Sequence, residues 1–259
     1  MSLKQSFLSA FRVMNFVVAE RAWRALSAEA DFRVGKELPG KNILIIAPHP
    51  DDEVFGAFAA LQKTEEHNNL ITKERKNRRT EELKIIYLFA GDKEPKSEKA
   101  KIREEESKDK ELQQFFFRLP DNTHISKNVI TKIAEIIAGA EIIFLPSFSD
   151  PNIDHRESVR ATVEALKIAT IKNHNLKNIQ IWLYEIWNPL PYFNRLIEID
   201  WCEKEKAMAK FTSQKSERNY IKAIKFLNEY RGEIYGLGKP AEAFFAIPAD
   251  LLVKLYRKE

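Results

Sequence analysis

Short apolar runs alternate with helical stretches along most of this chain, and no other feature of the sequence limits its fold so strongly. Five runs, each bounded by charged or proline-containing segments, are predicted strands: 43–46, 84–90, 141–146, 180–187 and 243–247. The intervals have the apolar spacing of helices: 54–66, 99–117, 127–138, 156–172, 202–211 and 217–230. This alternation predicts an α/β, Rossmann-like fold, with a mostly parallel sheet and helices on both faces. In such a sheet the functional site lies at the carboxyl ends of the strands.

The length of 259 residues suits one enzyme domain, and a hydrophobic content of 44% is enough for a large core. We therefore expect residues 41–259 to form a single α/β domain and residues 1–40 to form a helical extension packed on it. Charged residues interrupt the apolar segment 3–26, which disfavours a secretory signal. The alternative for this segment is a helix on a membrane surface. No stretch is long and apolar enough to span a bilayer.

The charge and the cysteine content exclude several classes of protein. A net charge of +4 is mild for this length and gives no reason to expect a nucleic-acid partner. Cys202 is the only cysteine, which excludes an intramolecular disulfide and a thiolate-rich zinc site. It also fits a reducing compartment, so we expect a cytoplasmic protein, membrane-associated if the N-terminal segment binds lipid. The glycines form no phosphate-binding fingerprint, which disfavours a nucleotide enzyme.

A histidine and two carboxylates follow the first strong strand directly. His49 and Asp52 are separated by two residues at a predicted strand-to-helix turn, so both side chains are able to reach one cation. A catalytic zinc takes three protein ligands and keeps one position for water, and Asp51 remains as the base for that water. In the structural alternative, Asp51 or Asp52 caps the following helix and His49 is an ordinary loop residue.

A second strand-to-helix turn supplies the third ligand that such a site needs. The apolar run ending at residue 146 is followed by Asp154 and His155, just before a predicted helix. His49, Asp52 and His155 together make an open zinc site, and Asp154 is a carboxylate that orients a ligand from behind. Taken alone, His155 is equally a solvated loop histidine. Two turns that carry matching ligands favour the metal site.

These motifs resemble the PIG-L/LmbE-like zinc-dependent de-N-acetylases, which remove acetyl groups from N-acetylglucosaminyl compounds. The segment 47–53, with the sequence APHPDDE, is similar to the family's first motif, and 152–155 is similar to its second. Further similar segments follow in the family's order, at 89–92, 103–106, 231–232 and 241–244. The resemblance implies an enzyme, a zinc-dependent amidohydrolase, with His49, Asp52 and His155 as metal ligands and Asp51 as general base.

The resemblance also implies a substrate site, and here the chain departs from the family. Arg103 is expected to position the substrate, and Asp121 to bind a sugar hydroxyl. Asn152 stands where the family usually has a histidine that stabilises the oxyanion. An amide is able to donate a hydrogen bond there, but it carries neither a proton nor a charge. The catalytic residues we expect are therefore Asp51 and Asn152.

The expected substrate is an N-acetylated sugar or glycoconjugate, and the expected cofactor is Zn²⁺, with another divalent cation such as Fe²⁺ as the alternative. Two other functions remain open: hydrolysis of a different amide or an ester, and sugar binding with weak catalysis. Self-association into a homo-oligomer is also open. The aromatic, proline-rich segment 187–193 is suited to stacking on a sugar ring, although ordinary packing explains it equally well.

Overall fold

The structure is a computed structural model that describes residues 33–35, 40–62, 82–171, 176–214 and 219–256. The predicted N-terminal helical extension lies outside these residues, apart from a three-residue strand and Gly40, and so does the end of the predicted helix 54–66. No helix within the described ranges combines the length and the apolar character that crossing a membrane requires.

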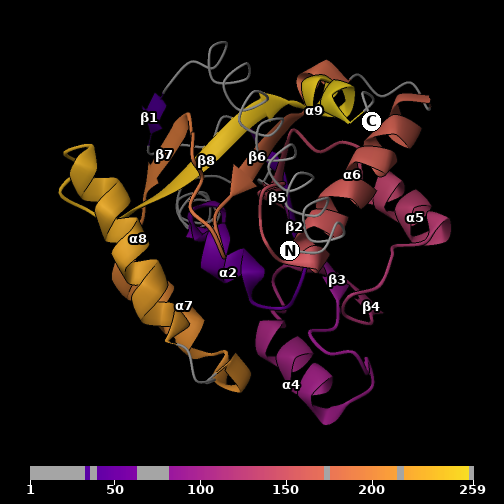
Figure 1. Ribbon diagram of the computed structural model, residues 1–259, viewed down its shortest axis with the longest axis horizontal. Coiled ribbons are helices and arrows are strands. Elements are labelled where there is room, and N and C mark those ends of the chain that lie inside the picture. Colours follow the sequence, from indigo (N-terminus) through magenta and orange to yellow (C-terminus); the bar gives the residue numbers. More distant parts are fainter. Residues whose placement is uncertain (1–32, 36–39, 63–81, 172–175, 215–218, 257–259) are drawn as a thin grey trace, which may run out of the picture.

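The described residues form an eight-stranded sheet with the order β1-β7-β8-β6-β5-β2-β3-β4 (Figure 1). The strands are β1 (Arg33–Gly35), β2 (Asn42–Ala47), β3 (Glu82–Phe89), β4 (Gln113–Leu119), β5 (Ile142–Pro146), β6 (Gln180–Tyr184), β7 (Arg195–Glu198) and β8 (Ala241–Pro248). Only β8 runs antiparallel to its neighbours, β6 and β7. The predicted α/β fold with a mostly parallel sheet is therefore confirmed.

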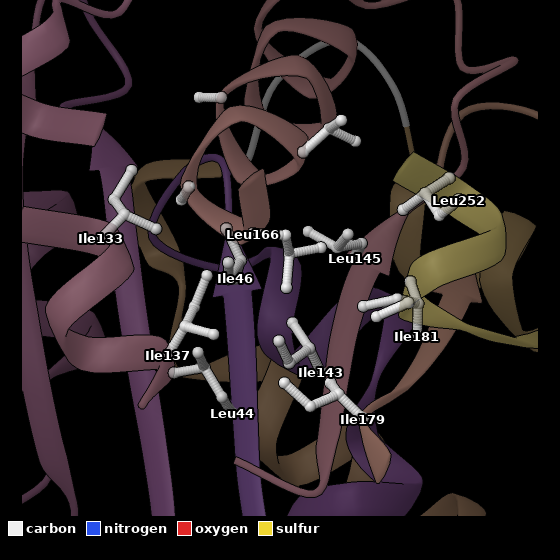
Figure 2. Packing of buried hydrophobic residues seen from close by; sticks show 14 of the residues in the cluster. Leu44, Ile46, Ile133, Ile137, Ile143, Leu145, Leu166, Ile179, Ile181 and Leu252 are labelled. Carbon is white, nitrogen blue, oxygen red and sulfur yellow. The ribbon is translucent and has the colours of Figure 1, made fainter. Parts of the chain in front are cut away.

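Helices cover both faces of the sheet, as predicted. They are α2 (Asp52–Gly56), α4 (Glu98–Ser107), α5 (Lys127–Ile137), α6 (Ile153–Ile171), α7 (Trp201–Ala209), α8 (Tyr220–Ile234) and α9 (Ala249–Leu255). Leu44 and Ile46 of β2 pack on one face with residues of α5, α6 and α9, including Leu166 (Figure 2). Ile43 and Ile45 pack on the opposite face with residues of α2, α7 and α8. This division follows from the alternating side-chain directions of a strand.

Strands β1, β4 and β7 and helix α9 were not predicted, and two predicted helices differ from the structure. The segment 99–117 is not one helix, because α4 ends at Ser107 and the chain then forms β4. Three consecutive phenylalanines within β4 pack against both faces of the sheet edge, which a strand allows and a helix does not. The short strands β1 and β7 and the helix α9 were also missed, since three to seven residues carry little periodicity.

The predicted helix 54–66 is interrupted near its start. Helix α2 ends at Gly56, Ala57 is not helical, and helical structure resumes at residues 58–62. A side chain at position 56 would collide with the ring of Tyr184 on β6. Glycine therefore lets α2 lie directly on the sheet, and this close packing fixes the turn that precedes the helix.

Candidate metal centre

Two neighbouring parallel strands deliver the predicted ligands to one place. β2 and β5 pair in parallel, so their carboxyl ends lie side by side at the same edge of the sheet. His49 lies in the turn after β2, and Asp52 begins α2. His155 lies in the first turn of α6, which follows β5. The ligand atoms of these three buried residues lie within 4.8 Å of one another.

The carboxylate of Asp52 lies between the two imidazoles. Its Oδ2 atom is 3.3 Å from His49 Nδ1 and 3.4 Å from His155 Nε2. The same oxygen accepts a hydrogen bond of 2.9 Å from the backbone N–H of His49, which fixes the turn. The structure thus brings the three predicted metal ligands together.

Each imidazole has a second carboxylate on its far side. His49 Nε2 lies 3.1 Å from Asp154 Oδ2, and His155 Nδ1 lies 3.2 Å from Asp150 Oδ2. Asp154 has the place that we predicted for it, whereas Asp150 was not predicted. A carboxylate behind each histidine orients the ring and makes the other nitrogen a better metal ligand.

The ionisation of this cluster is strongly shifted by burial and by the opposing charges. Burial alone would lower the pKa of His49, but Asp154 and Asp52 raise it to about 10. The pKa of His155 is likewise lowered by burial and raised, by Asp52 and Asp150, to about 9. Burial opposes ionisation of Asp52, yet the two histidines hold its pKa well below its usual range.

The chemistry of these side chains fits a divalent cation. Neither contact of His155 has hydrogen-bond geometry, so both nitrogens of this fully buried ring lack a hydrogen-bond partner among the described residues. The nitrogen that binds a metal needs no such partner, which accounts for Nε2 on the side of Asp52, while Nδ1 faces Asp150. Two imidazoles and a carboxylate are the ligand types that zinc and related cations prefer. A cation binding here displaces the protons that the histidines otherwise hold.

Asp51 belongs to the same turn but is not part of the candidate ligand group of His49, Asp52 and His155. Its φ of 124° lies in a region that non-glycine residues rarely adopt, which is a strained conformation. Its backbone N–H donates to Glu53 Oε2 over 3.0 Å, and its Oδ2 accepts from Arg103 Nη2 over 3.2 Å. Burial and the charge of Asp52 raise the pKa of Asp51 to about 7, although Arg103 opposes the shift.

Arg103 is held by the end of β3 as well as by Asp51. Its Nη1 atom donates to the Gly91 carbonyl over 2.8 Å. Gly91 has a φ of 76°, and a side chain there would collide with the Arg103 guanidinium. The backbone N–H of the same glycine donates to Asp121 Oδ1 over 2.9 Å. One glycine thus holds both predicted substrate-binding residues.

Asn152 caps helix α6, a role that was not predicted for it from the sequence. Its side-chain oxygen accepts a hydrogen bond of 2.9 Å from the backbone N–H of Asp154, in the first turn of α6. The side-chain oxygen is therefore a helix cap, and this contact does not use the NH₂ group. The residue also lines a cavity to which His49 and Asp52 contribute.

A cavity of about 710 Å³ lies over the cluster. The ligands His49 and Asp52 contribute to its floor, together with Asp51. Its other lining residues are Arg103, Asp121, Asn122, Asn152, Asp154, Asn219 and six side chains with apolar character: Phe55, Ile186, Trp187, Tyr220, Ala223 and Ile224. The site residues we predicted therefore lie in or beside one cavity at the carboxyl ends of the strands.

Reasoning from the sequence missed Asp150 and Glu53. Each lies within three residues of a predicted site residue, so the motifs covered the segments but not these contacts. Asp150 lies between β5 and α6, five residues before His155. This closeness in sequence was the signal from which its contact with His155 could have been predicted. Glu53 is 3% exposed, and burial raises its pKa to about 8. A buried carboxyl that supports a strained backbone has no sequence signal.

Comparisons with known proteins agree with this geometry. Residues 44–166 match the model of the PIG-L family, described as GlcNAc-PI de-N-acetylase. This match confirms the resemblance predicted from the motifs. The matched segment includes His49, Asp51, Asp52, Asn152 and His155. No functionally curated protein matches the chain in sequence.

Three solved structures share the fold. The conserved protein TT1542 from Thermus thermophilus is 21% identical, with a TM-score of 0.59 over 80% of this chain and 94% of that one. The 4-carboxy-2-hydroxymuconate hydratase GalB from Pseudomonas putida is 17% identical, with a TM-score of 0.61 over 80% and 96%. The A40926 pseudoaglycone deacetylase Dbv21 is 16% identical, with a TM-score of 0.55 over 81% and 98%.

Proposed function

We propose that this chain is a metal-dependent hydrolase that removes the acetyl group from an N-acetylglucosaminyl sugar or glycoconjugate, because residues 44–166 match the model of the PIG-L family. The main support for the proposal is that the side chains of the first motif, 47–53, face different partners. His49 and Asp52 face His155, whereas the adjacent Asp51 faces Arg103 and is left out of the candidate ligand set. A protein that only bound metal would have no need of this separate carboxylate.

His49, Asp52 and His155 would hold the cation, for which we propose Zn²⁺, with Fe²⁺ as the alternative. When bound, such a cation polarises an amide carbonyl and lowers the pKa of a water molecule towards neutrality. Asp154 and Asp150 lie beside the far nitrogens of His49 and His155 and keep the two imidazoles oriented.

Asp51 moves the proton in this proposal. A general base works best when its pKa is near the working pH, and burial raises the pKa of Asp51 to about 7. Its carboxylate takes a proton from the attacking water and returns it to the leaving amine. Arg103 keeps this carboxylate in place, because its guanidinium bridges Asp51 and the Gly91 carbonyl.

Asn152 supports the developing negative charge on the acyl oxygen. Its NH₂ group is the donor that remains once its oxygen caps α6. A fixed donor aimed at such an oxygen contributes about 3 kcal/mol to transition-state stabilisation in related chemistry. Asp121 and Asn122 line the same side of the cavity and offer polar groups to sugar hydroxyls.

Acetate release from N-acetylglucosamine and from its methyl and aryl glycosides tests the proposal. The protein is purified, loaded with Zn²⁺ or Fe²⁺, and assayed by mass spectrometry for acetate and for the free amine, with and without a chelator. We expect release that a chelator abolishes and that the metal restores. Chelator-insensitive release contradicts the metal mechanism. Release only from other amides or esters favours the wider hydrolase, and binding without any release favours a catalytically weak sugar-binding protein.

A further inference from the structure

The cavity over the metal site has two chemically different walls. The sheet order places β2 and β5, which precede the metal ligands, between β3 and β4 on one side and β6 and β8 on the other. Arg103, Asp121 and Asn122 belong to segments that follow β3 and β4, so they form a polar wall. Figure 1 shows α4 and α8 on different sides of α2.

The opposite wall is formed mostly by apolar side chains, with Asn219 at the start of α8 as its polar member. Ile186 and Trp187 follow β6, Phe55 lies on α2, and Tyr220, Ala223 and Ile224 lie on α8; we call these six residues the apolar wall. The rings of Trp187 and Tyr220 meet edge to face, with centroids 5.3 Å apart. Trp187 keeps 40% of its surface exposed although it lies in the cavity. This wall offers a ligand an apolar surface.

The apolar wall is tied to the metal centre by one carboxylate. Asp150 Oδ2 lies 3.2 Å from His155 Nδ1, and the same oxygen accepts a hydrogen bond of 3.4 Å from the backbone N–H of Trp187. The Asn188 side chain adds a contact of 3.5 Å to the Ser149 carbonyl. Trp187 is therefore positioned by the same group that orients a metal ligand, which places it as part of the site.

The position of the base decides which part of a substrate faces this wall. Asp51 is bound to Arg103, so it lies on the side of the polar wall. In amide hydrolysis the leaving nitrogen must approach the group that protonates it. The amine and its sugar then lie beside Arg103, Asp121 and Asn122, where hydroxyls find partners. The acyl group, on the other side of the carbonyl carbon, extends towards the apolar wall.

We propose that the apolar wall is a subsite for an acyl chain longer than acetyl, and that the preferred substrate is an N-acylated amino sugar with a hydrocarbon or aryl acyl group. The inference rests on the proposed function and extends its substrate class from N-acetyl to longer N-acyl groups. The amide carbon–nitrogen bond breaks, the water oxygen remains in the released carboxylate, and the water proton reaches the amine through Asp51. A cavity of 710 Å³ lies within the usual range of about 300–1,000 Å³ for drug-sized ligands.

The test is a series of N-acyl glucosamines with acyl chains of increasing length, from acetyl through butanoyl and hexanoyl to octanoyl, assayed on the metal-loaded enzyme for free amine. Each methylene that becomes buried increases kcat/KM by about fourfold. We expect kcat/KM to rise from acetyl to hexanoyl by about 10²-fold when most of the added methylenes are buried. The variants Trp187→Ala and Ile224→Ala should reduce the ratio of hexanoyl to acetyl activity. Phe226→Ala is the matched control, because Phe226 lies on the same helix, is 58% exposed and is not among the cavity-lining residues.

Binding to the Asp51→Asn variant, measured by calorimetry, separates the two proposals because it needs no turnover. Tighter binding of longer acyl compounds supports the subsite even if none of them is hydrolysed, in which case only the proposed function fails. An equal affinity for all chain lengths overturns the subsite, as does a chain-length preference that survives Trp187→Ala and Ile224→Ala. A second series of substrates, the aryl and octyl glycosides of N-acetylglucosamine, tests the alternative that the apolar wall binds the aglycone. If they gain rate and Trp187→Ala removes that gain, the wall binds the aglycone and the acyl assignment is wrong.

Discussion

Arg103 and Asp51 are joined by a contact of 3.2 Å between Nη2 and Oδ2, in a place where both side chains are largely shielded from water. Arg103 also holds the Gly91 carbonyl at the end of β3. The guanidinium thus connects one strand end to the strained turn that follows another. Asp51 is thus held by Arg103 and lies outside the candidate ligand group, so its role can be tested without changing a metal ligand.

Replacing Asp51 with asparagine should lower kcat by about 10²–10⁴-fold, the usual contribution of a general base. The metal content, measured by plasma mass spectrometry, should stay at the wild-type level because the ligand set is unchanged. Asp200→Asn is the control, since Asp200 is an exposed cap of α7. A metal-loaded Asp51→Asn variant with full activity would show that the base has been misassigned.

Gly91→Ala should reduce turnover by about 10²-fold, because the new methyl group displaces the guanidinium of Arg103 and lets Asp51 shift. Gly139→Ala is a matched control. Gly139 also has a positive φ, of 90°, but a side chain there meets no described atom within 4 Å. Both variants should lose about 1–2 kcal/mol of unfolding free energy from backbone strain. Equal kinetic effects of the two variants would mean that displacement of Arg103 is irrelevant.

Asp150→Asn should weaken metal binding by about 10–100-fold, because the carboxylate that orients His155 loses its charge. Competition with a chromophoric chelator measures this affinity directly. Asp109→Asn, on the exposed segment before β4, provides the control. Wild-type affinity in the Asp150 variant would indicate that His155 needs no support from behind.

The two roles of Asn152 are separable by Asn152→Asp. Aspartate caps a helix as well as asparagine does, so the unfolding free energy measured in urea should be unchanged. The NH₂ donor is lost, so kcat should fall by about 10²-fold or more. Asn152→Ala should lose both properties. If the aspartate variant keeps its kcat with a full metal complement, the oxyanion role is excluded.

Loss of the buried ion pair between Lys204 on α7 and Glu242 on β8 should lower the free energy of unfolding strongly. Lys204 Nζ lies 2.5 Å from Glu242 Oε1, and the two side chains are 0% and 3% exposed. Glu242 also accepts hydrogen bonds from the backbone N–H groups of Phe58 and Ala59. Lys204→Met should cost about 3–5 kcal/mol, because it leaves a buried charge unpaired. Lys254→Met breaks an exposed pair and should cost less than about 1 kcal/mol. Equal losses in urea unfolding would contradict this account.

The parts of the fold that depend on long apolar runs were predictable from the sequence. β2 and β5 are continuous apolar strands, buried on both faces, and their ends place His49 and His155 without further information. β4 was predicted as helix, because the charged residues of α4 run into it without a proline or glycine between them. Its strand conformation comes from pairing with β3, a contact between distant segments that a local pattern does not contain.

The same distinction applies to the site. Spacing within a turn and the order of strands bring His49, Asp52 and His155 together. The bond between Arg103 and Asp51, by contrast, depends on how α4 packs over the end of β3. The apolar wall joins a loop after β6 to α8, which is more than 30 positions away in the chain. Such contacts are determined by packing and have no local sequence signal.

The apolar wall lies mainly on the loop after β6 and at the start of α8, whereas the metal ligands and Asp51 lie in the segments directly after β2 and β5. The residues that recognise the acyl group are therefore on different segments from the residues that break the bond. Exchange of the loop after β6 together with the start of α8 would redirect selectivity while the turns that follow β2 and β5 stay intact. A scaffold divided in this way is suited to diversification, since substitutions that admit a new acid need not disturb the bond-breaking residues.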